Sequence, residues 1–81
     1  MKKNIFKEYG FDTIEEYFNY IIESKINGQF TQVQNLIKQL SKKDITDFIK
    51  WCDLEKDAIP ADQIKDYAHC KNAAIDILSE M

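Results

Sequence analysis

The chain of 81 residues contains no arginine, and all 11 of its cationic side chains are lysines. Arginine is the planar, bidentate donor that dominates guanine recognition and buried pairing with carboxylates and phosphates. The formal net charge is -3, whereas a free-standing nucleic-acid-binding domain usually carries a basic surface. The lack of arginine and the acidic balance therefore both count against a protein whose main task is to bind nucleic acid.

Cysteine and glycine are scarce, with two residues of each, and there is a single proline. Cys52 and Cys70 could form at most one bridge, which is too few for a disulfide scaffold, and we expect both to be reduced thiols in the core. Gly10 and Gly28 stand alone near expected helix boundaries, so the chain has no glycine-rich phosphate loop. These shortages exclude a disulfide-stapled fold and a P-loop nucleotide site.

Long apolar runs are also lacking, since no stretch approaches the roughly 18 apolar residues of a membrane-spanning helix. The N-terminal Met1-Lys2-Lys3 leads into a mixed polar segment rather than the apolar core of a signal peptide. We therefore expect a cytoplasmic protein. With 44% hydrophobic and 31% charged residues, residues 1–81 fit a single helical domain, near the size at which one core is only just sufficient.

Helix-start signals occur four times along the chain and predict an all-α fold. A short side-chain acceptor at the N-cap, answered three residues later, satisfies free N–H groups at a helix start, and proline favours the first turn. The signals are Asp12 with Glu15, Thr31 with Gln34, Ser41 with Asp44, and Pro60. We expect a compact bundle of four main helices, at about 12–27, 32–40, 42–57 and 60–80, with a short N-terminal helical turn.

Apolar residues recur at helical spacing within these ranges and predict which faces are buried. The first two helices have mainly single stripes, and the last two have broader apolar arcs. For the last helix the expected main stripe is Ile64, Tyr67, Ala68, Ala74, Ile75 and Leu78, widened by Cys70, Ala73 and Ile77. Helices with such broad arcs need more than one neighbour, so we expect any working surface in the second half of the chain.

Residues suited to catalysis or metal binding do not converge. His69 and Cys70 are adjacent, but neighbours on a helix point about 100° apart and cannot act together as base and nucleophile. Structural zinc sites use closely spaced pairs of ligands, and neither Cys52 nor Cys70 has such a mate. Glu15 and Glu16 are sequence neighbours rather than groups that meet across a cleft. We therefore expect no catalytic residues, no metal, no cofactor and no enzyme activity.

A DNA-binding alternative comes from residues 32–51, whose pattern predicts a helix, a tight joint and a second helix. In a helix-turn-helix protein the second helix presents its N-terminal part to the major groove. The lysines suited to phosphate contacts are Lys38, Lys42, Lys43 and Lys50. Asp44 and Asp47 lie on the same early turns, and helix pairs of this kind are common in proteins that bind no DNA. A helix-turn-helix-like regulator is therefore an alternative rather than the first hypothesis.

Several apolar and aromatic residues lie outside the simplest buried stripes. They are Tyr20, Trp51, Leu54, Ala58 and Ile77. Tryptophan and tyrosine often anchor protein interfaces, but small proteins also bury aromatic side chains wherever they can. These residues are therefore either core or a partner-binding surface. Our first hypothesis is a small, non-enzymatic protein-interaction module that binds another protein, and a homodimeric adaptor, in which the partner is a second copy, is a further alternative.

The amino-acid composition suggests, by analogy, what kind of protein the partner is. Twelve isoleucines stand against four leucines, and together with the lysine bias this is typical of AT-rich coding DNA. The small size, the acidity and this composition would suit a protein of a phage or other mobile element that inhibits or adapts a host protein. The analogy suggests a host protein as the partner.

Overall fold

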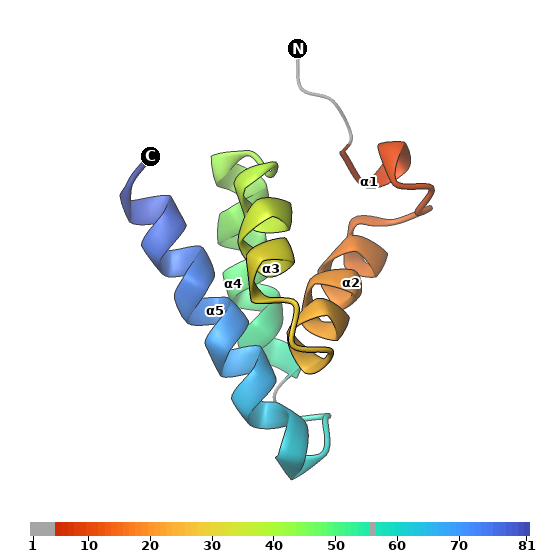
Figure 1. Cartoon of the computed structure of the whole chain (residues 1–81), viewed down its shortest axis with the longest axis vertical. Coiled ribbons are helices and arrows are strands. Elements are labelled where there is room, and N and C mark those ends of the chain that lie inside the picture. Colours follow the sequence, from red (N-terminus) through yellow and green to blue (C-terminus); the bar gives the residue numbers. More distant parts are fainter. Residues whose placement is uncertain (1–4, 56) are drawn as a thin grey trace.

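The computed structural model describes residues 5–55 and 57–81, which fold into an all-α bundle (Figure 1). Residues 1–4, which include the polar N-terminus considered above, and Lys56 lie outside the described part. The elements are α1 (Ile5–Glu8), α2 (Ile14–Ile26), α3 (Phe30–Lys38), α4 (Lys42–Glu55), the 3-10 turn η1 (Ala61–Gln63) and α5 (Ile64–Ser79). The predicted fold class, with four main helices after a short N-terminal helical turn, is confirmed.

The N-cap of α2 lies one residue later than predicted, at Thr13 and not at Asp12. The Thr13 hydroxyl accepts a hydrogen bond from the Glu16 N–H at 3.3 Å. In return, the Glu16 carboxylate accepts from the backbone N–H groups of Thr13 (3.1 Å) and Asp12 (2.7 Å). One carboxylate thus satisfies two free donors, which explains why this capping box prevails over the overlapping pair of Asp12 and Glu15.

The turn between α2 and α3 is shorter than predicted, so the N-cap assignment at Thr31 is wrong. Gly28 has a φ of 78°, a left-handed conformation that glycine adopts without the strain caused by a Cβ atom. The Gln29 N–H then donates to the Ser24 carbonyl at 2.8 Å, which turns the chain back at once. Helix α3 therefore starts at Phe30 without a side-chain cap, and Thr31 lies in its first turn.

The joint between α3 and α4 is longer than predicted, because α3 ends at Lys38 rather than at Leu40 and residues 39–41 separate the two helices. The Ser41 hydroxyl accepts from the Asp44 N–H at 3.2 Å, and the Ile45 N–H donates to the Ser41 carbonyl at 2.9 Å. Leu40, within the joint, is only 3% exposed and fixes the link to the core. The helix-start signal at Ser41 is therefore confirmed.

Pro60 separates α4 from α5, but the expected helix from 60 to 80 starts differently. Pro60 has a φ of -59°, and its carbonyl accepts from the Gln63 N–H at 2.9 Å. This bond closes the 3-10 turn η1, and α-helical geometry begins only at Ile64. Tight first turns of this kind are common at helix N-termini.

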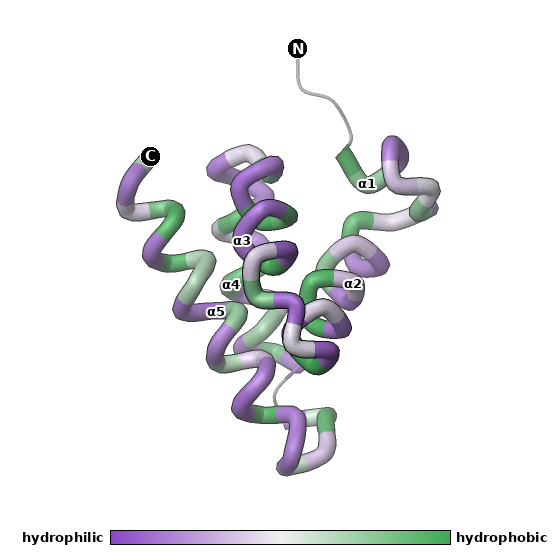
Figure 2. Tube along the Cα trace, in the orientation of Figure 1, coloured by the Kyte–Doolittle hydropathy of each residue, from purple (hydrophilic) through white to green (hydrophobic). Residues whose placement is uncertain are grey.

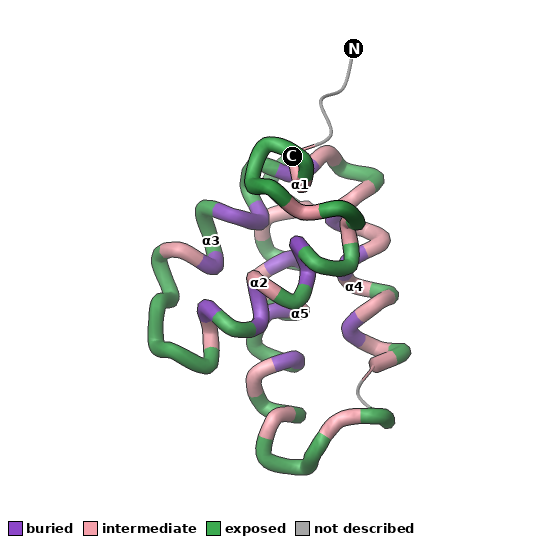
Figure 3. The backbone as a smooth tube through the Cα atoms, turned by 90° about the vertical axis from the view of Figure 1, so that its right-hand side faces the viewer, coloured by how far each residue is buried: buried purple, intermediate pink, exposed green. Residues whose placement is uncertain are grey.

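The core lies between α2, α3, α4 and α5, where Figure 3 shows the buried positions facing the interior. Its buried hydrophobic residues are Tyr17, Phe18, Ile21, Ile22, Val33, Leu36, Ile37, Leu40, Ile45, Phe48, Cys52, Tyr67, Cys70 and Ala74. The Tyr17 hydroxyl donates to the Leu36 carbonyl at 2.7 Å, which pairs the one polar atom that this ring carries into the core. Shared burial stabilises helices that are too short to persist alone.

The buried face of α5 is rotated relative to the predicted stripe. Ile64 and Ile75 are each 42% exposed and Ala68 is exposed, whereas Cys70 and Ala74 are fully buried. Figure 2 shows that hydrophobic residues recur along the whole of α5. Such a broad arc does not determine which part faces inward, and the packing of α5 against α2, α3 and α4 does.

The molecule measures 39 × 28 × 23 Å along its principal axes. Within residues 5–55 and 57–81, none of the helices combines the length and the apolar character needed to cross a membrane.

Candidate interaction surfaces

Trp51 lies in an aromatic cluster at the edge of the core. Its ring centroid is 5.5 Å from that of Phe18, 6.0 Å from that of Phe48 and 5.6 Å from that of Tyr67. The pairs with Phe48 and Tyr67 are stacked, with interplanar angles of 21° and 30°. Stacked aromatic pairs stabilise a protein beyond the effect of area burial alone. Trp51 is partly buried and packs against the core, so it supports a surface rather than projecting from one.

Leu54 and Ala58, by contrast, are exposed. Leu54 lies one turn after Trp51 and is 77% exposed, the highest value among the large hydrophobic residues of the described part. Ala58 follows α4 and is exposed, and Ile64 at the start of α5 is 42% exposed. The chain reverses direction between α4 and α5, so these residues share one end of the bundle (Figure 1). We call Leu54, Ala58 and Ile64 the α4–α5 end.

Acidic side chains accompany the α4–α5 end. Residues 53–66 contain five acidic residues and two lysines, and Asp57 and Asp62 are exposed. Lys71 Nζ forms a salt bridge with Asp53 Oδ1 at 2.6 Å, which links α4 to α5 just inside this end. The α4–α5 end therefore combines exposed apolar side chains with a negative charge balance.

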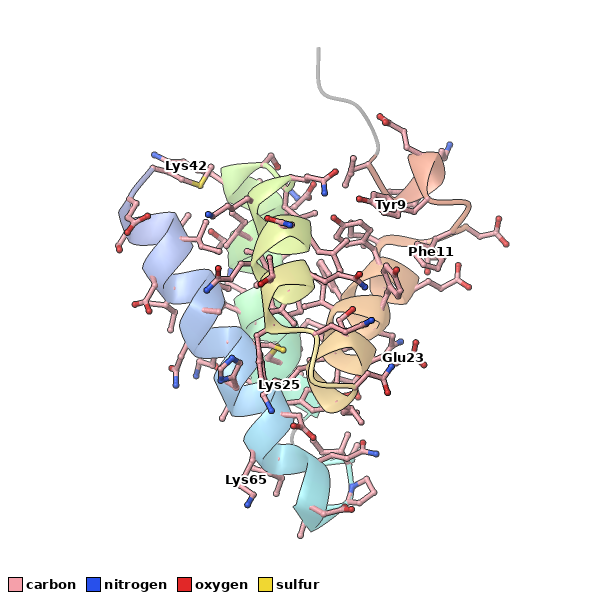
Figure 4. The ribbon with its side chains drawn as sticks, viewed as in Figure 1. Tyr9, Phe11, Glu23, Lys25, Lys42 and Lys65 are labelled. Carbon is pink, nitrogen blue, oxygen red and sulfur yellow. The ribbon has the colours of Figure 1, made fainter. Side chains whose placement is uncertain are left out.

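Tyr20 lies elsewhere, in a hollow of about 450 Å³ beside α3. The hollow is lined by Tyr9, Tyr20, Thr31, Gln32, Asn35, Leu36 and Gln39, and we call it the tyrosine hollow. The Tyr20 ring centroid is 5.6 Å from that of Phe11 and 6.3 Å from that of Tyr9. Figure 4 shows Tyr9 and Phe11 beside α2. The segment before α2 therefore folds back and covers part of Tyr20.

Hydrogen bonds hold the two sides of the tyrosine hollow together. Gln32 Nε2 donates to the Tyr20 hydroxyl at 3.1 Å and to the Ser24 hydroxyl at 2.8 Å. Gln39 Nε2 donates to the Tyr9 hydroxyl at 2.9 Å. Both glutamines belong to the α3 side, while the two tyrosines come from α2 and from the segment before it. The bonds therefore tie α2 and the segment before it to α3 across the hollow.

Ile77 lies in a further hollow, of about 460 Å³, between α3 and α5. On α5 it is about 20 Å from Ile64, because an α-helix rises 1.5 Å per residue. The lining residues of this hollow are Gln34, Lys38, His69, Asn72, Ala73, Asp76, Ile77 and Glu80. Of the residues predicted to bind a partner, Trp51 and Leu54 lie in the last turns of α4 and Ala58 follows that helix, whereas Tyr20 and Ile77 line two separate hollows.

The lysines of the DNA-binding alternative are all exposed. They are Lys38, Lys42, Lys43 and Lys50, and Figure 4 shows Lys42 at the opposite end of the bundle from Lys65. Lys43 Nζ forms a salt bridge with Asp47 at 3.1 Å. Lys38 shares its hollow with Asp76 and Glu80. Acidic groups thus accompany two of these lysines and weaken the positive field that a phosphate backbone needs.

Cys52 and Cys70 are free, buried thiols, as predicted. Burial is the main cause that raises the pKa of each thiol to about 12. Both thiols are therefore protonated at neutral pH and are poor nucleophiles. His69 is exposed while its neighbour Cys70 is buried, which confirms that they face different ways. Within the described residues, His, Cys, Asp and Glu side chains form no group of three or more that could hold a metal ion.

A contact between the last turn of α2 and α5 could not be predicted from the sequence. Lys25 Nζ lies 2.9 Å from an Asp66 carboxylate oxygen, and the two side chains are 18% and 19% exposed. The same Nζ is 5.3 Å from the centroid of the Phe30 ring, and Phe30 is 51% exposed. The partners Lys25 and Asp66 are 41 positions apart, so no local pattern in the sequence indicates this pair.

Comparison of the chain with protein-family models, with curated proteins and with solved structures finds no match.

Proposed function

We propose that the protein is a non-enzymatic interaction module whose α4–α5 end docks onto a basic, partly apolar surface of another protein. The observation that carries the proposal is the 77% exposure of Leu54. Its neighbour Trp51, one turn earlier, packs against the core instead. Complete burial of a leucine side chain contributes about 1.5–3 kcal/mol. A partner that covers Leu54 therefore gains a stabilising contact that the free protein lacks.

The aromatic cluster beneath Leu54 supports this proposal. Trp51 precedes Leu54 by one turn and is held by three aromatic neighbours. A side chain on a rigid base loses little conformational freedom when a partner covers it, and low ordering costs favour binding. Hot spots of protein interfaces lie in well-packed surroundings of this kind.

The charges around the α4–α5 end favour a basic partner. Asp57 and Asp62 are exposed there, and the whole chain carries a net charge of -3. Complementary charge mainly accelerates association and suppresses wrong partners. We place the interaction in the cytoplasm, since the free thiols Cys52 and Cys70 fit a reducing compartment. A host protein bound by a phage-encoded module fits this proposal by analogy.

Site-specific photo-crosslinking tests the proposal. Benzoylphenylalanine replaces Leu54 in one variant and Gln34, an exposed residue of α3, in a matched control. After irradiation in the source cells, we expect a crosslinked protein with basic surface residues at position 54 and none at position 34. Equal yields of that protein at both positions would contradict the proposal.

Two further measurements separate this function from the alternatives. Sedimentation velocity at micromolar concentration is expected to show a monomer, whereas a stable dimer would support the homodimeric adaptor. An electrophoretic shift of duplex DNA that is lost when Lys42, Lys43 and Lys50 are replaced by Gln would instead support the DNA-binding regulator, because phosphate contacts depend on such lysines.

A further inference from the structure

The tyrosine hollow has walls that are polar but uncharged. Its lining within the described residues consists of tyrosines, a threonine, a leucine and the amides Gln32, Asn35 and Gln39. A phosphate or carboxylate would find no cationic side chain in this lining, and a cation would find no carboxylate. Removing a charge from water without a partner is costly. The lining therefore selects a neutral ligand that offers both hydrogen-bond donors and acceptors.

Two groups on α3 carry hydrogen-bonding atoms that face this space. Thr31 and Asn35 are exposed and line the hollow, and among the described residues their side chains form no hydrogen bond with the protein. They are four residues apart, which corresponds to about 6 Å along a helix. In an extended peptide, groups that point the same way repeat every two residues, or about 6.6 Å. The two spacings match closely enough for one peptide to meet both side chains.

The chemistry of these groups also fits a peptide backbone. An asparagine amide offers a donor and an acceptor together, as a peptide N–H and C=O require. The Tyr20 hydroxyl accepts from Gln32 and retains its own proton for donation to a carbonyl. The tyrosine rings supply apolar surface for an uncharged side chain. Tyrosine is a low-entropy contact residue of this kind in many binding surfaces.

The tyrosine hollow is also preformed. Gln39 bonds Tyr9 at one border and Gln32 bonds Tyr20 at another, while the Tyr9 and Tyr17 rings pack edge to face at 5.4 Å. A ligand therefore does not have to order these walls, and such preorganisation favours binding.

We propose that the tyrosine hollow binds an extended, uncharged peptide segment, with Thr31 and Asn35 reading its backbone and Tyr9 and Tyr20 flanking its side chains. This site is distinct from the α4–α5 end, so either can fail while the other stands. It gives the module a second docking point, suited to a flexible segment of a partner rather than to a folded surface.

Peptide selection followed by NMR mapping tests this inference. A random twelve-residue peptide library is panned against the wild-type protein, and the enriched peptides are synthesised and titrated into ¹⁵N-labelled protein. We expect the enriched sequences to share an uncharged stretch and to shift the backbone resonances of Tyr20, Thr31 and Asn35. We also expect Asn35→Ala to lower the affinity for the best peptide by at least about fivefold, because the peptide backbone loses its hydrogen bonds with the side-chain amide of Asn35.

A matched control keeps the test decisive. Asn35 is exposed and alanine is a better helix former, so Asn35→Ala should fold normally, which circular dichroism verifies. Gln34→Ala alters the neighbouring exposed amide outside the tyrosine hollow and should leave peptide affinity unchanged. The inference is overturned if no peptide is enriched, if the enriched peptides carry charged residues throughout, if they shift resonances only at the α4–α5 end, or if both variants bind equally.

Discussion

The contrast between Trp51 and Leu54 can be tested by stability measurements on single variants. The two residues are three positions apart on α4, yet Trp51 contacts three core aromatics while Leu54 is 77% exposed. Truncation of a buried tryptophan costs about 3–5 kcal/mol. Because Trp51 is only partly buried, we expect Trp51→Ala to cost about 3 kcal/mol, the lower end of that range.

This loss is large for a chain of 81 residues, whose free energy of unfolding is expected to be about 4–12 kcal/mol. With a urea m value of about 1 kcal/mol/M, the unfolding midpoint should fall by about 3 M. The milder Trp51→Phe keeps one ring in the aromatic cluster and should lower the midpoint less. It provides a measurable variant even where Trp51→Ala is too unstable to study.

Leu54→Ala should behave differently, because most of the leucine side chain is in water in both the folded and the unfolded state. Substitutions at such positions usually change stability by less than about 0.5 kcal/mol, and both residues are good helix formers. Urea titrations followed by circular dichroism at 222 nm compare the three variants with the wild type. A larger loss for Leu54→Ala than for Trp51→Ala would refute the assignment of Trp51 to the core and Leu54 to the surface.

Three further predictions concern local structure and titration. Thr13→Ala removes the N-cap acceptor of α2 and should lower the free energy of unfolding by about 1 kcal/mol. Asp12→Ala removes only a side chain outside the capping box and should lower it by less than about 0.5 kcal/mol. Thermal unfolding of both variants distinguishes the two capping assignments. Gly28→Ala meets no atom within 4 Å but places a Cβ at a φ of 78°, so backbone strain alone should cost about 1–2 kcal/mol. The folded-state pKa of about 12 for Cys52 and Cys70 lies above the unfolded value near 8.5, so their contribution to stability is complete below about pH 8.5 and is lost as the pH rises toward 12. The urea midpoint of the wild type should therefore decline between pH 7 and 11. The midpoint of Cys52→Ala should decline less over the same range, each protein being compared with its own midpoint at pH 7.

The sequence predicted the helices well because their start and stop signals are local. Ser41 caps α4, and Gly28 supplies the left-handed turn after α2. Where two signals overlap, local reasoning fails. Asp12 and Thr13 are both good N-cap residues, and only the two donors gathered by Glu16 decide between them.

The candidate surfaces were less predictable, because exposure depends on neighbours that are distant in sequence. The sequence leaves open whether Tyr20 belongs to the core or to a partner-binding surface, and only the structure shows that the chain before α2 folds back onto its ring. Ile64 was placed in the buried stripe of α5, but the rotation of that helix leaves it 42% exposed. Leu54 could be named from the sequence because helical geometry alone places it far from the buried face of α4, whereas Ala58 follows the end of that helix.

The central claim is that the α4–α5 end is a docking surface, and the affinity of the crosslinked partner tests it most directly. Titration calorimetry with the purified partner compares wild type with Leu54→Glu at low and at physiological salt. We predict that Leu54→Glu weakens binding at least about tenfold, which corresponds to about 1.4 kcal/mol, and that wild-type binding weakens as salt rises. Equal affinities for wild type and Leu54→Glu would contradict the account.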